Sequence, residues 1–357
     1  MSPVGAGGTV RVLVVDDSPV ARELLVHILG GAARIEVVGI ANDGEAAVRE
    51  AERLRPDVIL MDIHLPQLDG FAATRRIMET CPTRIVMATA TSDAKEVAAN
   101  FHAIDAGALA VLAKPVGAGH PGFAAAADEL IRTVRLMSEV QVVKRWPRDG
   151  SARCLAAAAS TAGAVRLVVV GASAGGPIAL KALLSGLPKD FPVPILIVQH
   201  ISDGFVDGFA EWLGDTSGYT VAVAKHGEEA RPGTAHVAPS ARHMQVRANQ
   251  TIALVDGAKE HGVKPSVSVL FRSAAAAFGA AASGVLLTGM GRDGADELKA
   301  LRQGGSITFA QDRESSAVFG MPGEAVARDA ATYVLAPDKI AVVLAGIVAR
   351  QRKQSHH

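Results

Sequence analysis

The 357-residue chain has little of several features that would place it in a specialised class of protein. It has two cysteines, Cys81 and Cys154, which are too few for a disulfide framework and suit a reducing compartment. Its 36 Lys and Arg residues balance 36 Asp and Glu residues, so the basic excess of a nucleic-acid binder is missing. No apolar signal segment opens the chain, and the stretch 274–291 is too rich in Ala and Gly to predict a membrane span. We therefore expect a cytoplasmic protein that neither enters a membrane nor binds nucleic acid.

Aromatic residues are also scarce, at 4% of the chain, although hydrophobic residues make up 49% of it. The interior must be built mainly from Val, Leu, Ile and Ala, and a globally disordered chain is excluded. A length of 357 residues exceeds what one hydrophobic core usually serves, so we expect two domains.

Short runs of branched apolar residues alternate with stretches whose apolar residues recur at helical spacing, such as 20–29 and 45–54. Runs of this kind are typical of strands that are buried on both faces of a parallel sheet. Five of them fall within residues 10–138, which indicates one small doubly wound α/β domain. The predicted strands are Val10–Val15, Ile35–Ile40, Val58–Met61, Ile85–Ala88 and Leu109–Leu112.

A second series of the same kind follows residues 139–164, a segment that we interpret as a linker. Its predicted strands are Leu167–Val170, Ile195–Val198 and Val285–Leu287, with helices at 178–184 and 205–213 between them. We therefore predict a second α/β domain over residues 165–350.

Carboxylates follow the strands of the first domain at the edge where a doubly wound sheet binds its ligands. Asp16 and Asp17 follow the first predicted strand and Asp62 follows the third, so we expect the three to lie together. Their mutual repulsion favours a divalent cation with oxygen ligands, and Mg²⁺ fits best. Thr89 and Lys114 follow the fourth and fifth strands, where a hydroxyl and a cation suit phosphoryl transfer to an Asp carboxylate.

With these residues in place, residues 10–138 resemble a response-regulator receiver domain. The matching segments are Asp16-Asp17, Met61-Asp62, the turn 65–70, Thr89-Ala90 and Lys114-Pro115. The resemblance implies a flavodoxin-like fold and phosphorylation of Asp62 by a chemotaxis histidine kinase. It also implies that Asp16, Asp17 and Asp62 hold Mg²⁺, and that Thr89 and Lys114 sense the phosphate.

The chain departs from many receivers at Val111, where they place an aromatic switch residue. His64 lies two residues after Asp62, and we interpret it as a solvent-facing loop residue rather than a metal ligand.

A glycine-rich turn follows the first strand of the second domain, in the sequence Gly171-Ala172-Ser173-Ala174-Gly175-Gly176-Pro177. The glycines allow a sharp turn, and Pro177 suits the first turn of a helix. Ser173 would stand near that helix N-terminus, where backbone N–H groups stabilise a developing oxyanion. The same turn also fits a phosphate-binding loop or a helix cap by Ser173, although no Gly-x-Gly-x-x-Gly fingerprint is present.

Two more residues follow strands of this domain and complete a possible hydrolytic set. His200 ends the strand that begins at Pro194, where it can accept a proton from Ser173, although a purely structural histidine is the alternative. Asp293 follows the strand at 285–287 and can orient the imidazole and stabilise its charged form. The backbone N–H of Met290, in the same loop as Asp293, can face the oxyanion.

The order Ser173, His200, Asp293 disfavours an α/β-hydrolase, in which the acid precedes the histidine. The order of these three residues and the sequence around them instead resemble the catalytic domain of the chemotaxis protein-glutamate methylesterases, the CheB family. Further matching segments are 236–240, 243–244, 264–271, 310–312 and 318–325. A receiver followed by this domain is the architecture of that family.

The resemblance implies a Rossmann-like esterase domain without a cofactor of its own. It implies hydrolysis of glutamyl γ-methyl esters on methylated transmembrane chemoreceptors, with release of methanol, and deamidation of selected glutamines. Ser173 would be the nucleophile, His200 the general base and Asp293 the orienting acid. The amides of Ala174, where the family often has Thr, and Met290 would bind the oxyanion. The segment 201–205 departs from the sequence that is typical of the family. The resemblance also implies that the unphosphorylated receiver covers the catalytic site.

Two other classes of function stay open at the level of sequence. A signalling adaptor with an inactive esterase site would need only the receiver and a binding surface. A nucleotide-binding regulator is disfavoured because a basic recognition helix is missing. A zinc site is disfavoured because His226, His236, His243 and His261 are scattered without ligand spacing.

Overall fold

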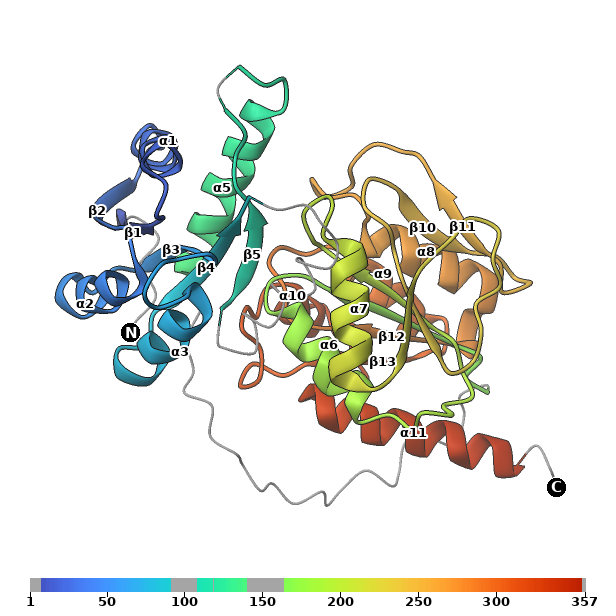
Figure 1. The fold of residues 1–357 in the computed structure, drawn as a ribbon. Helices are drawn as coiled ribbons and strands as arrows, with labels where there is room; N and C mark the ends of the chain where they lie inside the picture. Colours follow the sequence, from blue (N-terminus) through green and yellow to red (C-terminus); the bar gives the residue numbers. More distant parts are fainter. Residues whose placement is uncertain (1–7, 91–107, 118, 140–163, 355–357) are drawn as a thin grey trace. The chain divides into compact units, whose positions relative to one another are not determined.

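The computed structural model describes residues 8–90, 108–117, 119–139 and 164–354. They form two compact units, which divide between Arg145 and Trp146 (Figure 1). This boundary falls inside the predicted linker 139–164, of which all but the two end residues lie outside the described part of the chain.

The N-terminal unit contains a five-stranded parallel sheet in the order β2-β1-β3-β4-β5. Every residue of β3 and β4 is buried, as their unbroken apolar runs predict. The five predicted strands are confirmed within one residue at each end, although Asp62 and Thr89 are the last residues of their strands and do not follow them. The strands are β1 (Val10–Val15), β2 (Ile35–Ala41), β3 (Val58–Asp62), β4 (Arg84–Thr89) and β5 (Ala110–Ala113).

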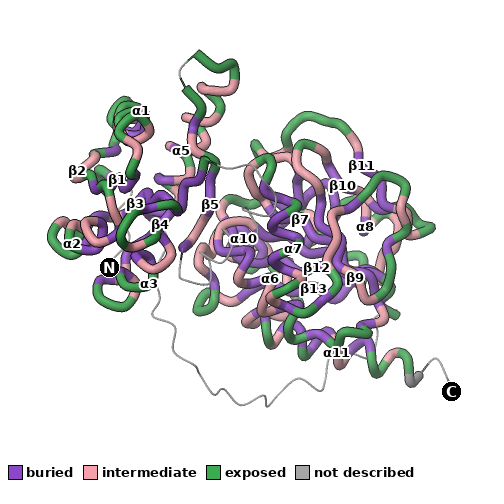
Figure 2. The backbone as a smooth tube through the Cα atoms, viewed as in Figure 1, coloured by how far each residue is buried: buried purple, intermediate pink, exposed green. Residues whose placement is uncertain are grey.

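Helices α1 (Pro19–Gly30), α2 (Gly44–Leu54), α3 (Gly70–Thr80) and α5 (Phe123–Ser138) complete this unit. The first three each begin after a polar residue whose side chain accepts a backbone N–H of the first turn: Ser18, Asp43 and Asp69. In Figure 2 the central strands β1, β3 and β4 are mostly buried while the outer sides of the helices are exposed.

The C-terminal unit contains a seven-stranded parallel sheet in the order β14-β13-β12-β6-β7-β9-β8. An antiparallel pair, β10 (His243–Val246) and β11 (Ile252–Val255), forms a second, small sheet. The sequence predicted the buried strands β6, β7 and β12 but missed the others. The seven strands are β6 (Leu167–Ala172), β7 (Ile195–Gln199), β8 (Thr220–Val223), β9 (Thr234–Val237), β12 (Ala282–Leu286), β13 (Ile307–Gln311) and β14 (Tyr333–Leu335).

Helices cover both faces of this sheet (Figure 1). Helix α6 packs with α7 and α11 on one face, and α9 packs with α8 and α10 on the other. The helices are α6 (Gly176–Ser185), α7 (Val206–Ser217), α8 (Val267–Phe278), α9 (Ala295–Gln303), α10 (Met321–Ala327) and α11 (Pro337–Gln354). Among the helices that the structure describes, we find none with the length and apolarity to cross a bilayer.

The strand order changes direction between β1 and β3 in the first sheet and between β6 and β12 in the second. Connections that leave such a pair run to opposite sides, so the space beyond the carboxyl ends of the two strands stays open to ligands. Asp16, Asp62 and Ser173 lie at the carboxyl ends of strands in these two pairs, and His200 follows β7, the neighbour of β6. The predicted fold class, two doubly wound α/β domains, is confirmed.

Candidate active site

The N-terminal unit brings its three predicted carboxylates together. Asp16 follows β1, Asp62 ends β3, and the two strands pair along Val12–Val15. Oxygens of Asp16, Asp17 and Asp62 all lie within 4.8 Å of one another, and we call these three residues the acidic cluster. Asp16 and Asp62 are buried and Asp17 is exposed. Carboxylate oxygens at this spacing are compatible with a hard divalent cation.

Lys114 joins the acidic cluster from beyond β5. Its Nζ lies 2.8 Å from Oδ2 of Asp16 and 2.7 Å from Oδ2 of Asp62. Burial lowers the pKa of Lys114, but hydrogen bonds with Asp16 and Asp62 outweigh it, so the pKa is raised overall. Its backbone N–H donates to the carbonyl of Thr89 over 2.7 Å, which fixes the end of β5 beside the end of β4. The five predicted positions thus converge at one edge of the sheet.

Burial raises the pKa of Asp62, although the ion pair with Lys114 opposes this change. The Ile63 N–H also donates to Oδ1 of Asp62 over 2.7 Å. His64 is exposed in the following loop, as predicted, and Val111 is buried in β5.

In the C-terminal unit Ser173 follows β6, two residues before the glycine that caps α6. The backbone of Ser173 is fixed on both sides: its N–H donates to Thr288, and its carbonyl accepts from Gly176 and from the Gln199 side chain. Gly175 has a φ of +74°, and a Cβ there would lie 2.4 Å from the Cβ of Ala317, so only glycine suits this turn. The Ser173 hydroxyl makes no hydrogen bond within the described part of the chain.

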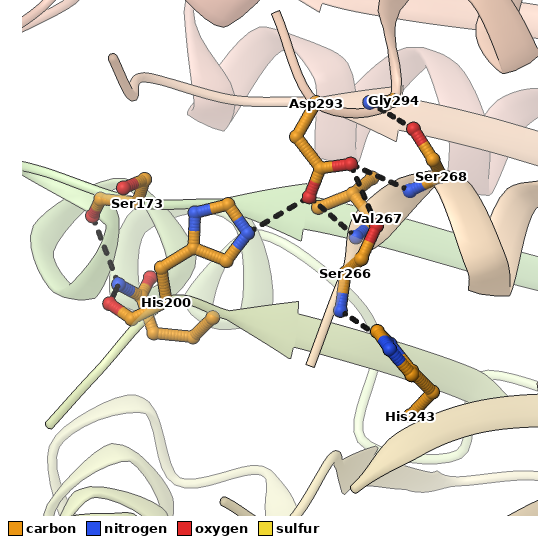
Figure 3. Close-up of polar contacts among 9 residues, drawn as sticks. Ser173, His200, His243, Ser266, Val267, Ser268, Asp293 and Gly294 are labelled. Carbon is orange, nitrogen blue, oxygen red and sulfur yellow. Dashed lines mark hydrogen bonds and ion pairs between the residues drawn. The ribbon is translucent and has the colours of Figure 1, made fainter. Parts of the chain in front are cut away.

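His200 follows β7, and its backbone N–H donates to Ala172 over 3.0 Å. Its Nε2 lies 2.9 Å from Oδ2 of Asp293. Figure 3 shows the imidazole between Asp293 and Ser173, with Nδ1 on the side of the serine. The three predicted residues, separated by up to 120 positions in the sequence (293 minus 173), therefore meet at the switch point of the sheet.

Asp293 is 2% exposed and receives four donors. Besides His200, the hydroxyl of Ser266 donates to Oδ1 over 2.8 Å, the amide of Val267 to Oδ2 over 2.7 Å, and the amide of Ser268 to Oδ1 over 3.0 Å. Burial opposes ionisation, but the interactions with His200 and the two amides outweigh it and lower the pKa of Asp293. Asp293 is therefore an anion in the folded protein.

The two amides predicted to bind an oxyanion lie on the loops that flank Ser173. Neither the Ala174 N–H nor the Met290 N–H donates a hydrogen bond to another described residue. A Cβ at Gly289 would lie 2.7 Å from the Cβ of Ser173, so the loop that carries Met290 passes directly against Ser173. The hydroxyl of Thr288 lies 3.0 Å from the carbonyl of Ala174 and connects the two loops.

Similar chains carry the same combination of units. Residues 168–344 match the family described as CheB methylesterase, and residues 12–120 match the response regulator receiver domain. A protein-glutamate methylesterase/protein-glutamine glutaminase of Nitrosospira multiformis is 51% identical over 347 residues, which cover 96% of this chain and 98% of the relative. The chain belongs to the CheB methylesterase family.

Another relative in this family, protein-glutamate methylesterase/protein-glutamine glutaminase 1 of Syntrophus aciditrophicus, is 51% identical and covers 95% of this chain and 99% of its own. The crystal structure of the Thermotoga maritima CheB methylesterase catalytic domain is 35% identical, with a TM-score of 0.49. The match covers 52% of this chain and 98% of the Thermotoga maritima chain. The resemblance predicted from the sequence is confirmed.

Sequence reasoning assigned no role to Ser266, Gln199 or Thr288 in this CheB-family chain. Ser266 lies within the segment 264–271 that carried the resemblance, but its contact with Asp293 spans 27 residues and leaves no local signal. The four histidines considered for zinc do not group: within the described residues the acidic cluster alone has metal-ligand spacing.

Proposed function

We propose that this CheB-family chain is a phosphorylation-regulated protein-glutamate methylesterase and protein-glutamine glutaminase that acts through Ser173, His200 and Asp293. The observation that carries the proposal is the imidazole of His200, which is bound to a buried anion through Nε2 and has Nδ1 on the side of Ser173. An imidazole in this position can accept the serine proton, and the carboxylate stabilises the resulting cation.

Ester hydrolysis then takes two steps. Oγ of Ser173 attacks the γ-carbonyl carbon of the methylated glutamate while its proton passes to Nδ1 of His200. The oxyanion is bound by the N–H groups of Ala174 and Met290. The intermediate expels methanol, which takes the proton from His200, and leaves a glutamyl ester on Ser173. Water, deprotonated by His200, cleaves this ester and releases the glutamate side chain. A glutamine amide follows the same route with ammonia as the leaving group.

The acidic cluster of the receiver unit supports control by phosphorylation. Asp62 would accept the phosphoryl group from a chemotaxis histidine kinase. Asp16, Asp17 and Asp62 would hold Mg²⁺, which neutralises charge during the transfer. Lys114 already contacts two of these carboxylates and would pair with the phosphoryl oxygens, with Thr89 at the end of the neighbouring strand. The substrates would be methylated transmembrane chemoreceptors.

The catalytic part is tested by methanol release from membranes that carry radiolabelled, methylated receptors. Ser173→Ala should abolish release. Ser283→Ala should leave it unchanged, because that buried hydroxyl donates to the Ile307 carbonyl within the sheet. An adaptor would retain its output in the Ser173→Ala variant, and equal release by both variants would contradict the triad.

The regulatory part is tested with a small-molecule phosphodonor. The donor and Mg²⁺ should raise the esterase rate of the parent chain and leave that of Asp62→Ala unchanged. Equal rates with and without the donor would contradict control through Asp62.

A further inference from the structure

Asp293 is held by an element that lies outside the proposed triad. Ser266 precedes α8 and is fully buried, at 0% exposed. A serine at this position usually accepts an N–H from its own helix, yet the Ser266 side chain caps nothing in α8. It donates instead to Oδ1 of Asp293, and the first two N–H groups of the helix, those of Val267 and Ser268, donate to the same carboxylate (Figure 3). Asp293 therefore serves as the cap of α8.

His243 holds the backbone of Ser266 through a hydrogen bond to its N–H. The Ser266 N–H donates to Nδ1 of His243 over 3.2 Å, so this nitrogen carries no proton. The proton sits on Nε2, which donates to the carbonyl of Ala258 over 2.9 Å. His243 is buried and both of its ring nitrogens are paired. This arrangement orients Ser266 so that its hydroxyl points at Asp293 (Figure 3).

The donors around Asp293 also act on its charge. The Ser266 hydroxyl and the N-terminal dipole of α8 place positive partial charge against the carboxylate. A carboxylate neutralised in this way stabilises a neighbouring imidazolium less than an unbonded one would. The general base of a hydrolytic triad must be neutral before it can accept a proton.

We propose that Ser266, oriented by His243, is a positioning residue that holds the Asp293 carboxylate and moderates its charge, so that His200 stays in the neutral form needed for attack. The inference rests on the esterase function proposed above. Other charged groups lie on the surrounding elements: Lys181 on α6, Asp203 and Asp207 after β7, Arg272 on α8 and Arg292 beside Asp293. Of these, Arg272 interacts electrostatically with Asp293, while its guanidinium pairs with Glu260 and Glu297.

The test is the pH profile of kcat/KM for methyl ester hydrolysis by the full chain carrying Ser266→Ala. Without the hydroxyl, Asp293 keeps its two amide donors but carries more effective negative charge, which favours protonation of His200. The acid limb of the profile should move to higher pH by about half a unit or more. A half-unit shift corresponds to a loss of up to about 3-fold in activity on the acid limb, with little or no loss on the alkaline plateau.

Two matched variants separate this effect from loss of structure. Ser266→Thr keeps the hydroxyl and should restore the acid limb, and Ser283→Ala removes a buried hydroxyl elsewhere and should not move it. If Ser266→Ala folds poorly, Ser266→Cys replaces the hydroxyl by a weaker donor and should shift the acid limb in the same direction. An equal loss at every pH would overturn the proposal. So would an acid limb that moves to lower pH, because Asp293 would then have left His200.

A second measurement distinguishes failure of this inference from failure of the proposed function. NMR titration of the His200 imidazole in the parent chain and in Ser266→Ala needs no substrate. The titration should move to higher pH in the variant, whether or not the chain hydrolyses the tested ester. An unmoved titration overturns the role of Ser266, whereas a parent chain that releases no methanol overturns the esterase proposal.

Discussion

Gly289 lies so close to Ser173 that a Cβ added at position 289 would be 2.7 Å from the serine Cβ. The same atom would lie 2.4 Å from Sδ of Met321. The absence of a side chain at this position lets the loop after β12, which carries the Met290 amide, approach Ser173 closely.

Gly289→Ala is expected to push this loop away from Ser173. We expect a loss of about 10- to 100-fold in kcat, because an oxyanion donor is displaced by roughly 1 Å, and a loss of about 1–3 kcal/mol in stability from overpacking. Methanol release and thermal unfolding measure the two effects. Gly346→Ala in α11 is the control, since its Cβ would meet only Arg350 at 3.9 Å. Normal activity of Gly289→Ala would contradict the placement of Met290.

Asp293→Asn should lower kcat by about 10³- to 10⁴-fold and leave KM nearly unchanged, because the amide no longer fixes the tautomer and charge of His200. Asp296→Asn is the matched control, since this exposed residue pairs with Arg328 on the surface. Steady-state kinetics of methyl ester hydrolysis measure both. A KM effect without a kcat effect would place Asp293 in substrate binding instead.

Much of this site follows from the sequence, because its determinants are local. Buried parallel strands show as unbroken apolar runs, and the residue after such a run must emerge at the edge where ligands bind. Asp16, Ser173 and His200 were found in this way. The position of Lys114 against Asp16 and Asp62 follows from the order of the strands.

The missed features depend on contacts between distant segments. Strands β8 and β14 are short and half-exposed, so no apolar run marks them. From the sequence, Ser266 is expected to be an ordinary helix cap. Only the packing of α8 against the loop after β12 shows that its hydroxyl donates a hydrogen bond to Asp293. Hydrophobic patterning specifies which elements form but not which polar groups meet across them.

Stability should depend on pH through Asp293. Its pKa is lowered in the folded protein, because His200 and the amide donors outweigh the effect of burial. The carboxylate therefore stabilises the fold above its unfolded pKa of about 4, and this contribution is lost as pH falls through the folded value. We expect the urea midpoint to fall as pH drops below about 5, and to fall less in Asp293→Asn.

Fluorescence of Trp212, which is 1% exposed in α7, reports this transition in a Trp146→Phe background. All other carboxylates are common to the two proteins, so the difference between their pH slopes isolates Asp293. Parallel slopes would show that its lowered pKa contributes nothing to stability.

Lys114→Met should change cation binding and phosphorylation in opposite directions. Without the ammonium group the acidic cluster loses its internal partner, so Mg²⁺ should bind several-fold more tightly. Labelling by a small-molecule phosphodonor should fall, because no cation pairs with the phosphoryl oxygens. Calorimetry and phosphate incorporation measure the two effects, with Lys299→Met on the exposed surface of α9 as the charge-matched control. Weaker Mg²⁺ binding would contradict the pairing.

The capping of α8 by Asp293 ties the chemistry of the enzyme to the integrity of its interior. Leu270 and Phe271 anchor this helix in the hydrophobic core, so a chain that lost the acid would also leave buried donors of a core helix without an acceptor. A substitution that removes activity but preserves the fold is therefore easier to accommodate at Ser173 than at Asp293. The Ser173 side chain makes no hydrogen bond within the described part of the chain.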